Sequence, residues 1–140
     1  GCDIVTDTQM ARAGINKTIL GRLGGEARCF MSDPDVAAEA GARGVTRAMV
    51  SMEKAASLEK PCIFAIGNAP TALFALFDLI AAGKVRPALV IGAPVGFVNV
   101  VESKERIMTA GVPYIVAQGR KGGSNVAAAI CNAMLYQIAR

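Results

Sequence analysis

A segment near the carboxyl end of the chain, Gly-Arg-Lys-Gly-Gly-Ser at residues 119–124, carries the groups best suited to binding an anion. Its glycines permit positive φ and a close approach of the backbone to a ligand, and the amides that open a following helix attract negative charge. Arg120 and Lys121 add positive charge, and an arginine can hold a carboxylate through two parallel hydrogen bonds. The spacing matches neither GxxxxGK(S/T) nor GxGxxG. We therefore predict an anion site; a tight turn with two solvated basic side chains is the alternative.

Three further segments combine polar residues with glycine or proline after strand-like runs: residues 6–10 (Thr-Asp-Thr-Gln-Met), 67–71 (Gly-Asn-Ala-Pro-Thr) and 92–97 (Gly-Ala-Pro-Val-Gly-Phe). Asp7 is suited to hold a polar group of a ligand or to cap the turn that follows, and spacing does not separate these two roles. Asn68 is suited to be a helix N-cap ahead of Pro70. Phe97 is a candidate wall against a flat ligand, or else a core side chain.

The charged segment at residues 102–106 (Glu-Ser-Lys-Glu-Arg) is predicted to be an exposed helix face, because its charges pair at i,i+3 and i,i+4 spacing. Asp7 and Glu102 are the carboxylates that an acid–base pair would use. Since nothing in the sequence fixes their separation, we assign no acid–base chemistry to them.

Five short β-prone runs must position these loops, and we predict strands at residues 2–6, 27–31, 62–66, 88–91 and 113–117. The last three are almost continuously apolar, as are parallel strands buried on both faces. Helix-length segments alternate with the runs, as in βαβ units. We therefore predict an α/β fold: a three-layer α/β/α sandwich with a five-stranded, mainly parallel sheet and flavodoxin-like strand order. Ligands of such sheets bind beyond the carboxyl ends of the strands, where all four loops would then lie.

Helices are predicted at residues 34–58, 71–82 and 98–110, and from residue 124 to the end. Ser32 and Asp33 are capping candidates for the first helix, and Ser32 with Asp35 forms an S-x-x-D capping box. Glycines follow the second and third helices as stop signals. Residues 7–25 are predicted to hold a broken helix, interrupted at Gly14 and Gly21.

The chain of 140 residues contains no histidine, which excludes Ser-His-Asp and Cys-His catalysis, histidine metal ligation and a histidine pH switch from what these residues do alone. The length fits one domain, and a hydrophobic content of 53% excludes disorder. The formal net charge is +4, and residues 71–140 hold the whole excess, with seven basic and three acidic side chains. An anionic small molecule suits this half; ordinary solubilising charge is the alternative, and no basic run interleaved with aromatic residues indicates nucleic acid.

The four cysteines, at positions 2, 29, 62 and 131, form no CxxC pair, and three lie in apolar strand-like runs. We expect buried, reduced thiols and therefore a cytoplasmic protein. Residues 122–139, the longest uncharged stretch, contain serine, glutamine and two asparagines, so no membrane span is predicted. No signal peptide opens the chain, which begins at Gly1 and enters a strand-like run directly rather than starting with methionine; we expect that part of an N-terminus is missing.

At these loops the sequence resembles the precorrin-8X methylmutase (precorrin isomerase) family of corrin (cobalamin) biosynthesis. The matching stretches are residues 6–15 (Thr-Asp-Thr-Gln-Met-Ala-Arg-Ala-Gly-Ile), 66–73 (Ile-Gly-Asn-Ala-Pro-Thr-Ala-Leu), 94–97 (Pro-Val-Gly-Phe) with 102–104 (Glu-Ser-Lys), and 119–124. They run from the first predicted strand to the last predicted helix. The resemblance therefore covers essentially the whole chain, residues 1–140, as a single domain.

The resemblance implies a flavodoxin-like fold and a homodimer with active sites near the subunit interface. It implies an isomerase that moves one methyl group between neighbouring ring carbons of precorrin-8X or cobalt-precorrin-8, giving hydrogenobyrinic acid or cobyrinic acid. No dissociable cofactor, metal site, nucleic acid or membrane is expected; the partner is a tetrapyrrole. Its acetates and propionates suit arginine, lysine and backbone amides around a flat apolar slot, and catalysis would rest on orientation and charge stabilisation.

Carried over residue by residue, the resemblance assigns substrate binding to Thr6, Asp7, Met10, Asn68, Ala69, Pro70, Thr71, Pro94, Val95, Gly96, Phe97, Ser103, Arg120, Lys121, Gly122, Gly123 and Ser124. The family places its proton-transferring histidine in a segment N-terminal to the Thr-Asp motif, which here corresponds to a position before Gly1. No catalytic residue is therefore assigned within this chain. We expect the chain to be the C-terminal part of the enzyme, lacking its N-terminal segment.

Two other functions stay open from the sequence. One is a non-catalytic corrinoid-binding module or carrier, which corrinoid binding without methyl migration would favour. The other is a generic flavodoxin-like module that binds a phosphorylated ligand through residues 119–124, since a fold by itself implies no function. Tight binding of FMN or a sugar phosphate, without corrinoid binding, would favour it.

Overall fold

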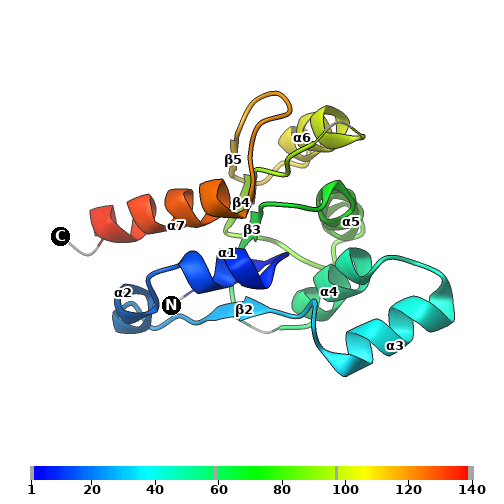
Figure 1. Ribbon diagram of the computed structural model, residues 1–140, viewed down its shortest axis with the longest axis horizontal. Helices are drawn as coiled ribbons and strands as arrows, with labels where there is room; N and C mark the ends of the chain where they lie inside the picture. Colours follow the sequence, from blue (N-terminus) through cyan, green and yellow to red (C-terminus); the bar gives the residue numbers. More distant parts are fainter. Residues whose placement is uncertain (1, 59, 97, 139–140) are drawn as a thin grey trace.

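The computed structural model describes residues 2–58, 60–96 and 98–138, and its centre is a five-stranded parallel sheet (Figure 1). The strands are β1 (Asp3–Thr6), β2 (Ala27–Cys29), β3 (Cys62–Ile66), β4 (Leu89–Gly92) and β5 (Tyr114–Val116). Their order across the sheet is β2-β1-β3-β4-β5, and each neighbouring pair is parallel. The five predicted strands and the flavodoxin-like order are therefore confirmed.

Helices cover both faces of the sheet and make the three layers (Figure 1). One face carries α1 (Gln9–Gly14), α2 (Lys17–Arg22) and α7 (Ser124–Ile138). The other carries α4 (Arg47–Ala56), α5 (Pro70–Ala81) and α6 (Val100–Met108), with α3 (Pro34–Arg43) packed on α4. Alternate strand side chains enter the two cores: Val5, Phe64 and Val90 on the α4–α6 side, Ile4, Ala65 and Ile91 on the α7 side, all fully buried.

The region predicted as one helix over residues 34–58 forms two helices, so that prediction is wrong. Gly44 ends α3 in the left-handed conformation, with φ 68°, and the Thr46 side chain accepts a hydrogen bond from the Met49 amide at the start of α4. Both helices bury their apolar side in the same core, so the apolar stripe continues across the turn. The other long helices are confirmed as α5, α6 and α7.

The predicted capping box of Ser32 and Asp35 does not form. Asp33 is the N-cap of α3 and makes no side-chain cap bond. Lys54 of α4 donates hydrogen bonds to Asp33 at 2.7 Å and to Asp35 at 3.0 Å. The Asp35 carboxylate, which a capping box would need, therefore accepts hydrogen bonds from the Lys54 ammonium instead.

The predicted broken helix over residues 7–25 is confirmed, but it breaks once, after Gly14, and not at Gly21. Gly14 ends α1, and a Cβ there would lie 2.9 Å from the Cβ of Ala128 on α7. Gly21 lies within α2. The turn between the helices is held by Asn132 of α7, which accepts from the Asn16 amide at 2.7 Å and donates to the Gly14 carbonyl at 2.9 Å.

The structure shows the state of the cysteines and whether a described helix could cross a membrane. The four cysteines are free thiols: Cys62 and Cys131 are buried, and Cys2 and Cys29 are half-buried. Burial raises the pKa of Cys131 to about 12, so this thiol stays protonated at neutral pH. None of the described helices has both the length and the apolar character needed to cross a membrane.

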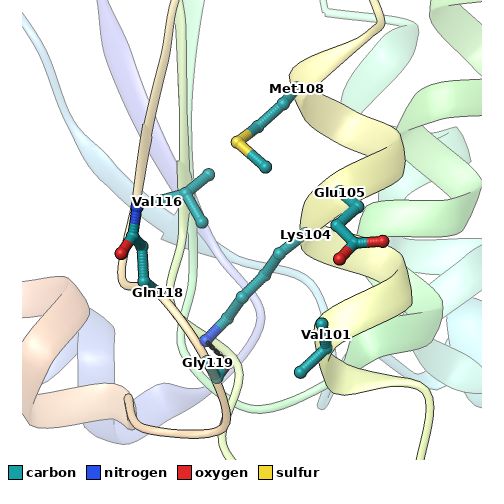
Figure 2. A pocket seen from close by; sticks show the side chains of 7 residues that line it. All are labelled: Val101, Lys104, Glu105, Met108, Val116, Gln118 and Gly119. Carbon is teal, nitrogen blue, oxygen red and sulfur yellow. Dashed lines mark hydrogen bonds between the residues drawn. The ribbon is translucent and has the colours of Figure 1, made fainter.

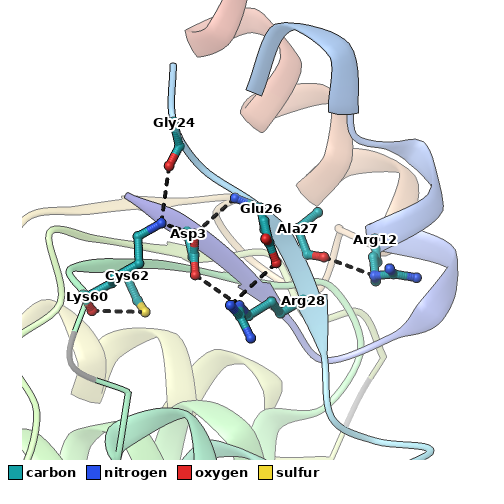
Figure 3. A network of polar contacts seen from close by, with 8 residues as sticks. All are labelled: Asp3, Arg12, Gly24, Glu26, Ala27, Arg28, Lys60 and Cys62. Atoms are coloured by element: carbon teal, nitrogen blue, oxygen red, sulfur yellow. Dashed lines mark hydrogen bonds and ion pairs between the residues drawn. The ribbon is translucent and has the colours of Figure 1, made fainter. Parts of the chain in front are cut away.

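A buried carboxylate at the amino end of β1 ties three strands together (Figure 3). Asp3 accepts hydrogen bonds from Arg28 Nε of β2 at 2.9 Å, from Lys60 Nζ before β3 at 3.0 Å and from the Glu26 amide at 2.9 Å. Lys60 also donates to the Gly24 carbonyl at 3.1 Å. Burial by itself would raise the pKa of Asp3, but these donors outweigh it and hold the pKa below its usual value.

We expect acid to destabilise the protein through Asp3. A carboxylate whose pKa is lower in the folded chain stabilises the fold above the unfolded pKa of about 3.9, and that contribution is lost as the pH falls through the folded value. Urea denaturation should show this loss below about pH 4 in the wild type and a smaller loss in Asp3→Asn. At neutral pH, Asp3→Asn should lower the free energy of unfolding by about 1–3 kcal/mol.

The matched control is Asp78→Asn, which changes an exposed carboxylate of α5. It should keep the wild-type stability and pH dependence, because surface substitutions away from special contacts cost little. If Asp3→Asn follows the wild-type curve at every pH, Asp3 does not carry the acid sensitivity.

Candidate ligand-binding site

The loops after β1, β3, β4 and β5 meet at the carboxyl edge of the sheet, as predicted from the sequence. Backbone hydrogen bonds join the last three of these loops: the Ala93 amide donates to the Ile66 carbonyl at 2.7 Å, the Gly123 amide to the Ala93 carbonyl at 2.8 Å, and the Gly96 amide to the Arg120 carbonyl at 3.2 Å. We call this connected surface the loop edge; it comprises residues 6–10, 67–71, 92–96 and 119–124.

Asp7 fixes the junction between β3 and α5. Its Oδ1 accepts a hydrogen bond from the Gly67 amide at 2.8 Å, and its Oδ2 accepts from the amides of Asn68 at 2.9 Å and Ala69 at 2.6 Å. Ala69 is the N-cap of α5 but has no capping side chain, and Pro70 has no amide hydrogen, so Asp7 supplies the cap from another loop. Burial raises the pKa of Asp7 above its usual value, although the three amides stabilise the anion.

These contacts bear on the two roles that the sequence left open for Asp7, of which ligand binding stays a prediction. Thr8, not Asp7, caps the turn that follows β1, by accepting from the Ala11 amide at 3.0 Å. Asp7 is only 1% exposed and both its oxygens accept from amides, so it positions loops. The predicted N-cap Asn68 is wrong: Ala69 occupies that position, and Asn68 is exposed.

Two glycines let these loops touch the start of α7. A Cβ on Gly67 would lie 2.7 Å from the Cα of Ser124, and a Cβ on Gly122 would collide with the Ala93 carbonyl oxygen. The hydroxyls of Thr8 and Ser124 share a hydrogen bond of 2.7 Å. The beginning of α7 therefore contacts the loops after β1, β3 and β4, and no larger residue fits at either glycine without moving the backbone.

Lys104 of α6 reaches the fourth loop from inside the protein (Figure 2). Its Nζ donates hydrogen bonds to the carbonyl oxygens of Gly119 and Lys121, both at 2.8 Å. Burial lowers the pKa of Lys104. Beside it lies a cavity of about 270 Å³ between α6 and the β5 strand and loop, lined by Val101, Lys104, Glu105, Met108, Val116, Gln118 and Gly119.

The prediction that residues 102–106 form an exposed helix face is wrong for two of them. Ser103 and Lys104 are buried, with exposed fractions of 0% and 2%. Glu102 and Arg106 do form the predicted i,i+4 pair, at 3.4 Å on the exposed side of α6. A helix that packs on a sheet turns one side inward, and here that side includes these two polar residues.

Neither a carboxylate pair nor a metal cluster forms at the loop edge. Asp7 is bonded to backbone amides, whereas Glu102 pairs with Arg106, so the two carboxylates do not bond to each other. Within the described residues, no group of three or more acidic or cysteine side chains is placed to hold a metal ion.

The predicted site residues fall into three classes of exposure. Five are exposed: Met10, Asn68, Val95, Arg120 and Lys121. Six are half-buried: Ala69, Pro70, Thr71, Gly96, Gly122 and Ser124. Five are buried: Thr6, Asp7, Pro94, Ser103 and Gly123.

Two positions named in the sequence predictions lie outside the described residues: Phe97, the candidate wall against a flat ligand, and Gly1, before which the family's histidine is expected. The structure therefore tests neither the role of Phe97 nor the position of a histidine that precedes Gly1. Both stay predictions.

The buried hydroxyls hold backbone rather than face outward. Thr6 Oγ1 donates to the Thr8 carbonyl at 2.8 Å, and Ser103 Oγ donates to the Val100 carbonyl at 2.8 Å. The residue that sequence reasoning missed is Lys104. It lies four positions after Val100 and three before Ile107, which are both buried, so this helical spacing would have indicated an inward lysine.

Comparison with known proteins gives one consistent result. The family model described as precorrin-8X methylmutase matches residues 1–137. The chain is 51% identical over 138 residues to the cobalt-precorrin-8 methylmutase of Salmonella typhimurium, covering 98% of this chain and 64% of that protein. It is 49% identical over 134 residues to the cobalt-precorrin-8 methylmutase of Priestia megaterium, covering 96% of this chain and 60% of that protein.

The fold agrees with these relatives. The crystal structure of precorrin-8X methyl mutase from Thermus thermophilus superimposes with a TM-score of 0.86 at 41% identity, covering 99% of this chain and 67% of that one. The chain thus spans less than two thirds of the length of the two curated relatives, 64% and 60%.

Substituting Asp7 tests whether it organises the loop edge. Asp7→Asn keeps the shape but turns an amide donor toward backbone donors, so we expect the free energy of unfolding to fall by about 1–3 kcal/mol. Urea denaturation measures this loss. Faster hydrogen exchange at the amides of Gly67, Asn68 and Ala69 should accompany it, because those amides lose their acceptor. Asp78→Asn is again the control, and unchanged exchange in Asp7→Asn would contradict the role.

Proposed function

Because the chain belongs to the precorrin-8X methylmutase family, we propose that it acts as an isomerase in corrin (cobalamin) biosynthesis. The reaction moves one methyl group between neighbouring ring carbons of precorrin-8X or cobalt-precorrin-8 and yields hydrogenobyrinic acid or cobyrinic acid. The connected loop edge is the observation that supports this site, because the stretches that resemble the family converge on it.

The chemistry of the loop edge suits a macrocycle fringed with carboxylates. Arg120 and Lys121 are exposed on a loop whose backbone is held by other loops, and they carry charge opposite to that of acetates and propionates. Met10 is 73% exposed and Val95 is 46% exposed, which offers apolar contact to a flat ring. The remaining residues of the proposed binding set are Asn68, Ala69, Pro70, Thr71, Pro94, Gly96, Phe97, Gly122, Gly123 and Ser124.

In this proposal the residues of the chain bind and orient the ring. The loop edge is interlocked before the ligand arrives, so less ordering is needed on binding and the positive charges are already in place to stabilise charge that shifts during methyl migration. Thr6, Asp7 and Ser103 act by holding the loops. The 140 residues contain no histidine, and we assign no side chain from Gly1 onward to proton transfer.

We propose that the substrate carries cobalt. The relatives that are 51% and 49% identical are named cobalt-precorrin-8 methylmutases. Binding of cobyrinic acid should therefore be at least as tight as binding of hydrogenobyrinic acid, and a clear preference for the metal-free ring would contradict this choice.

A homodimer in the cytoplasm is the proposed assembly and location. Large exposed apolar side chains lie on and beside α6 and the edge strand β5: Val98, Val101, Met108, Tyr114 and Ile115. β5 is the edge strand there, with one side unpaired. An apolar surface beside an unpaired strand edge is suited to a second copy of the chain.

Corrinoid binding tests the site directly. Titration of the protein with cobyrinic acid or hydrogenobyrinic acid should shift the absorption spectrum of the ring. Arg120→Ala should raise the dissociation constant about tenfold or more, because a charge-assisted hydrogen bond contributes about 1.5–3 kcal/mol. Arg86→Ala, which removes an exposed arginine just before β4 at the opposite end of the sheet, is the matched control and should bind normally.

Equal affinity in Arg120→Ala and the wild type would remove the carboxylate role from Arg120. Tight binding of FMN or a sugar phosphate, with no corrinoid binding, would contradict the proposed function itself.

Light scattering of the purified chain tests the assembly. We expect a dimer mass for the wild type and a monomer mass for Ile115→Lys, because a charge on β5 would be buried in the interface. Ile138→Lys changes another exposed isoleucine, at the end of α7, and should leave the mass unchanged. A monomeric wild type would contradict the dimer.

A further inference from the structure

We propose that Lys104 is a positioning residue that holds the backbone on both sides of Arg120 in the conformation that binds the ligand. This inference rests on the proposed function and deepens it, because it says what keeps the basic loop in place. None of the family-derived substrate assignments includes Lys104.

The geometry of the contact carries the proposal. Lys104 Nζ lies 2.8 Å from the carbonyl oxygen of Gly119 and 2.8 Å from that of Lys121. Figure 2 shows Lys104 extending from α6 to Gly119. These two carbonyls flank Arg120. Fixing both of them restricts the direction in which the backbone presents Arg120, whatever contacts the guanidinium itself makes.

Lys104 projects from a packed helix, whereas the loop at residues 119–124 contains glycines that allow its backbone more freedom. Lys104 projects from α6 between Val100 and Ile107, which are 1% and 0% exposed. The loop contains Gly119 at φ 74° and Gly123 at φ 126°, which are conformations that glycine adopts with little cost and also leaves easily. A lysine held by a packed helix therefore removes loop freedom before the ligand binds, and lowers the entropic cost of binding.

Burying the charge of Lys104 costs free energy of solvation that a purely structural apolar contact would not cost. It is 2% exposed, and no carboxylate of the described residues forms an ion pair with it. A buried ammonium balanced by carbonyl dipoles alone loses more solvation than an apolar side chain of the same length would. A carboxylate-rich ligand at the loop edge would offset that cost, because the positive charge of Lys104 adds to that of Arg120 and Lys121.

The decisive experiment compares three variants with the wild type. Lys104→Met keeps the length and apolar stem but removes the donors. Lys104→Arg restores donors and charge, and the cavity of about 270 Å³ beside the side chain leaves room for the longer group. Lys60→Met is the matched control: Lys60 also donates to a backbone carbonyl, that of Gly24, and in addition to Asp3, but at the amino end of the sheet.

Two measurements are made under conditions where each variant is fully folded by circular dichroism. The first is the dissociation constant for cobyrinic acid. The second is the rate of tryptic cleavage after Arg120 and Lys121, identified by mass spectrometry, which reports how often this loop opens without ligand. We expect about tenfold weaker binding and about tenfold faster cleavage for Lys104→Met, with at least half of each effect, on a logarithmic scale, recovered in Lys104→Arg.

Lys60→Met should lower the melting temperature yet leave both measurements at wild-type values. If Lys104→Met only lowers the melting temperature and binds and resists trypsin like the wild type, the proposal is overturned. The same holds if Lys60→Met changes binding as much as Lys104→Met does, since the effect would then follow global stability.

The two readouts also separate this inference from the function on which it rests. Absence of corrinoid binding by the wild type would contradict the proposed function, whereas the cleavage rates would still decide whether Lys104 holds the loop. Normal cleavage in Lys104→Met overturns the positioning role even where the wild type binds corrinoid.

Discussion

The three hydrogen bonds that Asp7 accepts from successive backbone amides are the interaction on which the loop edge depends. β1 lies between β2 and β3, and the Asp7 carboxylate at its end sets the turn from β3 into α5. Gly67 in that turn lies against Ser124, which the hydroxyl of Thr8 also holds. The start of α7 is thereby fixed against two loops. One buried carboxylate thus connects segments far apart in the sequence, because both of its oxygens accept hydrogen bonds from amides of another loop.

β1 carries a buried carboxylate at each end, and the two are compensated differently. Asp3, at the amino end, accepts hydrogen bonds from Arg28 and Lys60, and its pKa lies below the usual value. Asp7, at the carboxyl end, accepts hydrogen bonds from three backbone amides, and burial raises its pKa. Basic side chains at the amino end thus serve the fold itself. At the carboxyl end, backbone amides stabilise the carboxylate by hydrogen bonds, and the arginine and lysine of the fourth loop are exposed on the surface where the ligand is proposed to bind.

The interlocking of the loops also explains the form of the family resemblance. The four short stretches are far apart in the sequence, yet Thr8 bonds to Ser124, Gly67 touches Ser124, and Gly122 packs on Ala93. These residues form contacts with one another that a larger or apolar side chain would break. Part of each stretch is therefore required by loop-to-loop packing, independently of any contact with a ligand, while other residues of the stretches, such as Arg120, are exposed.

The sequence by itself determined the parallel sheet, its strand order and the convergence of four loops. Strands buried on both faces appear as apolar runs, and the helix-length segments between them provide the crossovers that parallel strands need. It also determined the stretches that identify the family. The tertiary structure alone decided which partners the inward polar residues have. Asp7 caps α5 from another loop, and Lys104, whose inward position follows from helical spacing, donates to the carbonyls of Gly119 and Lys121. Partner choice depends on which distant segment packs against a residue, and the local pattern of a sequence does not contain that information.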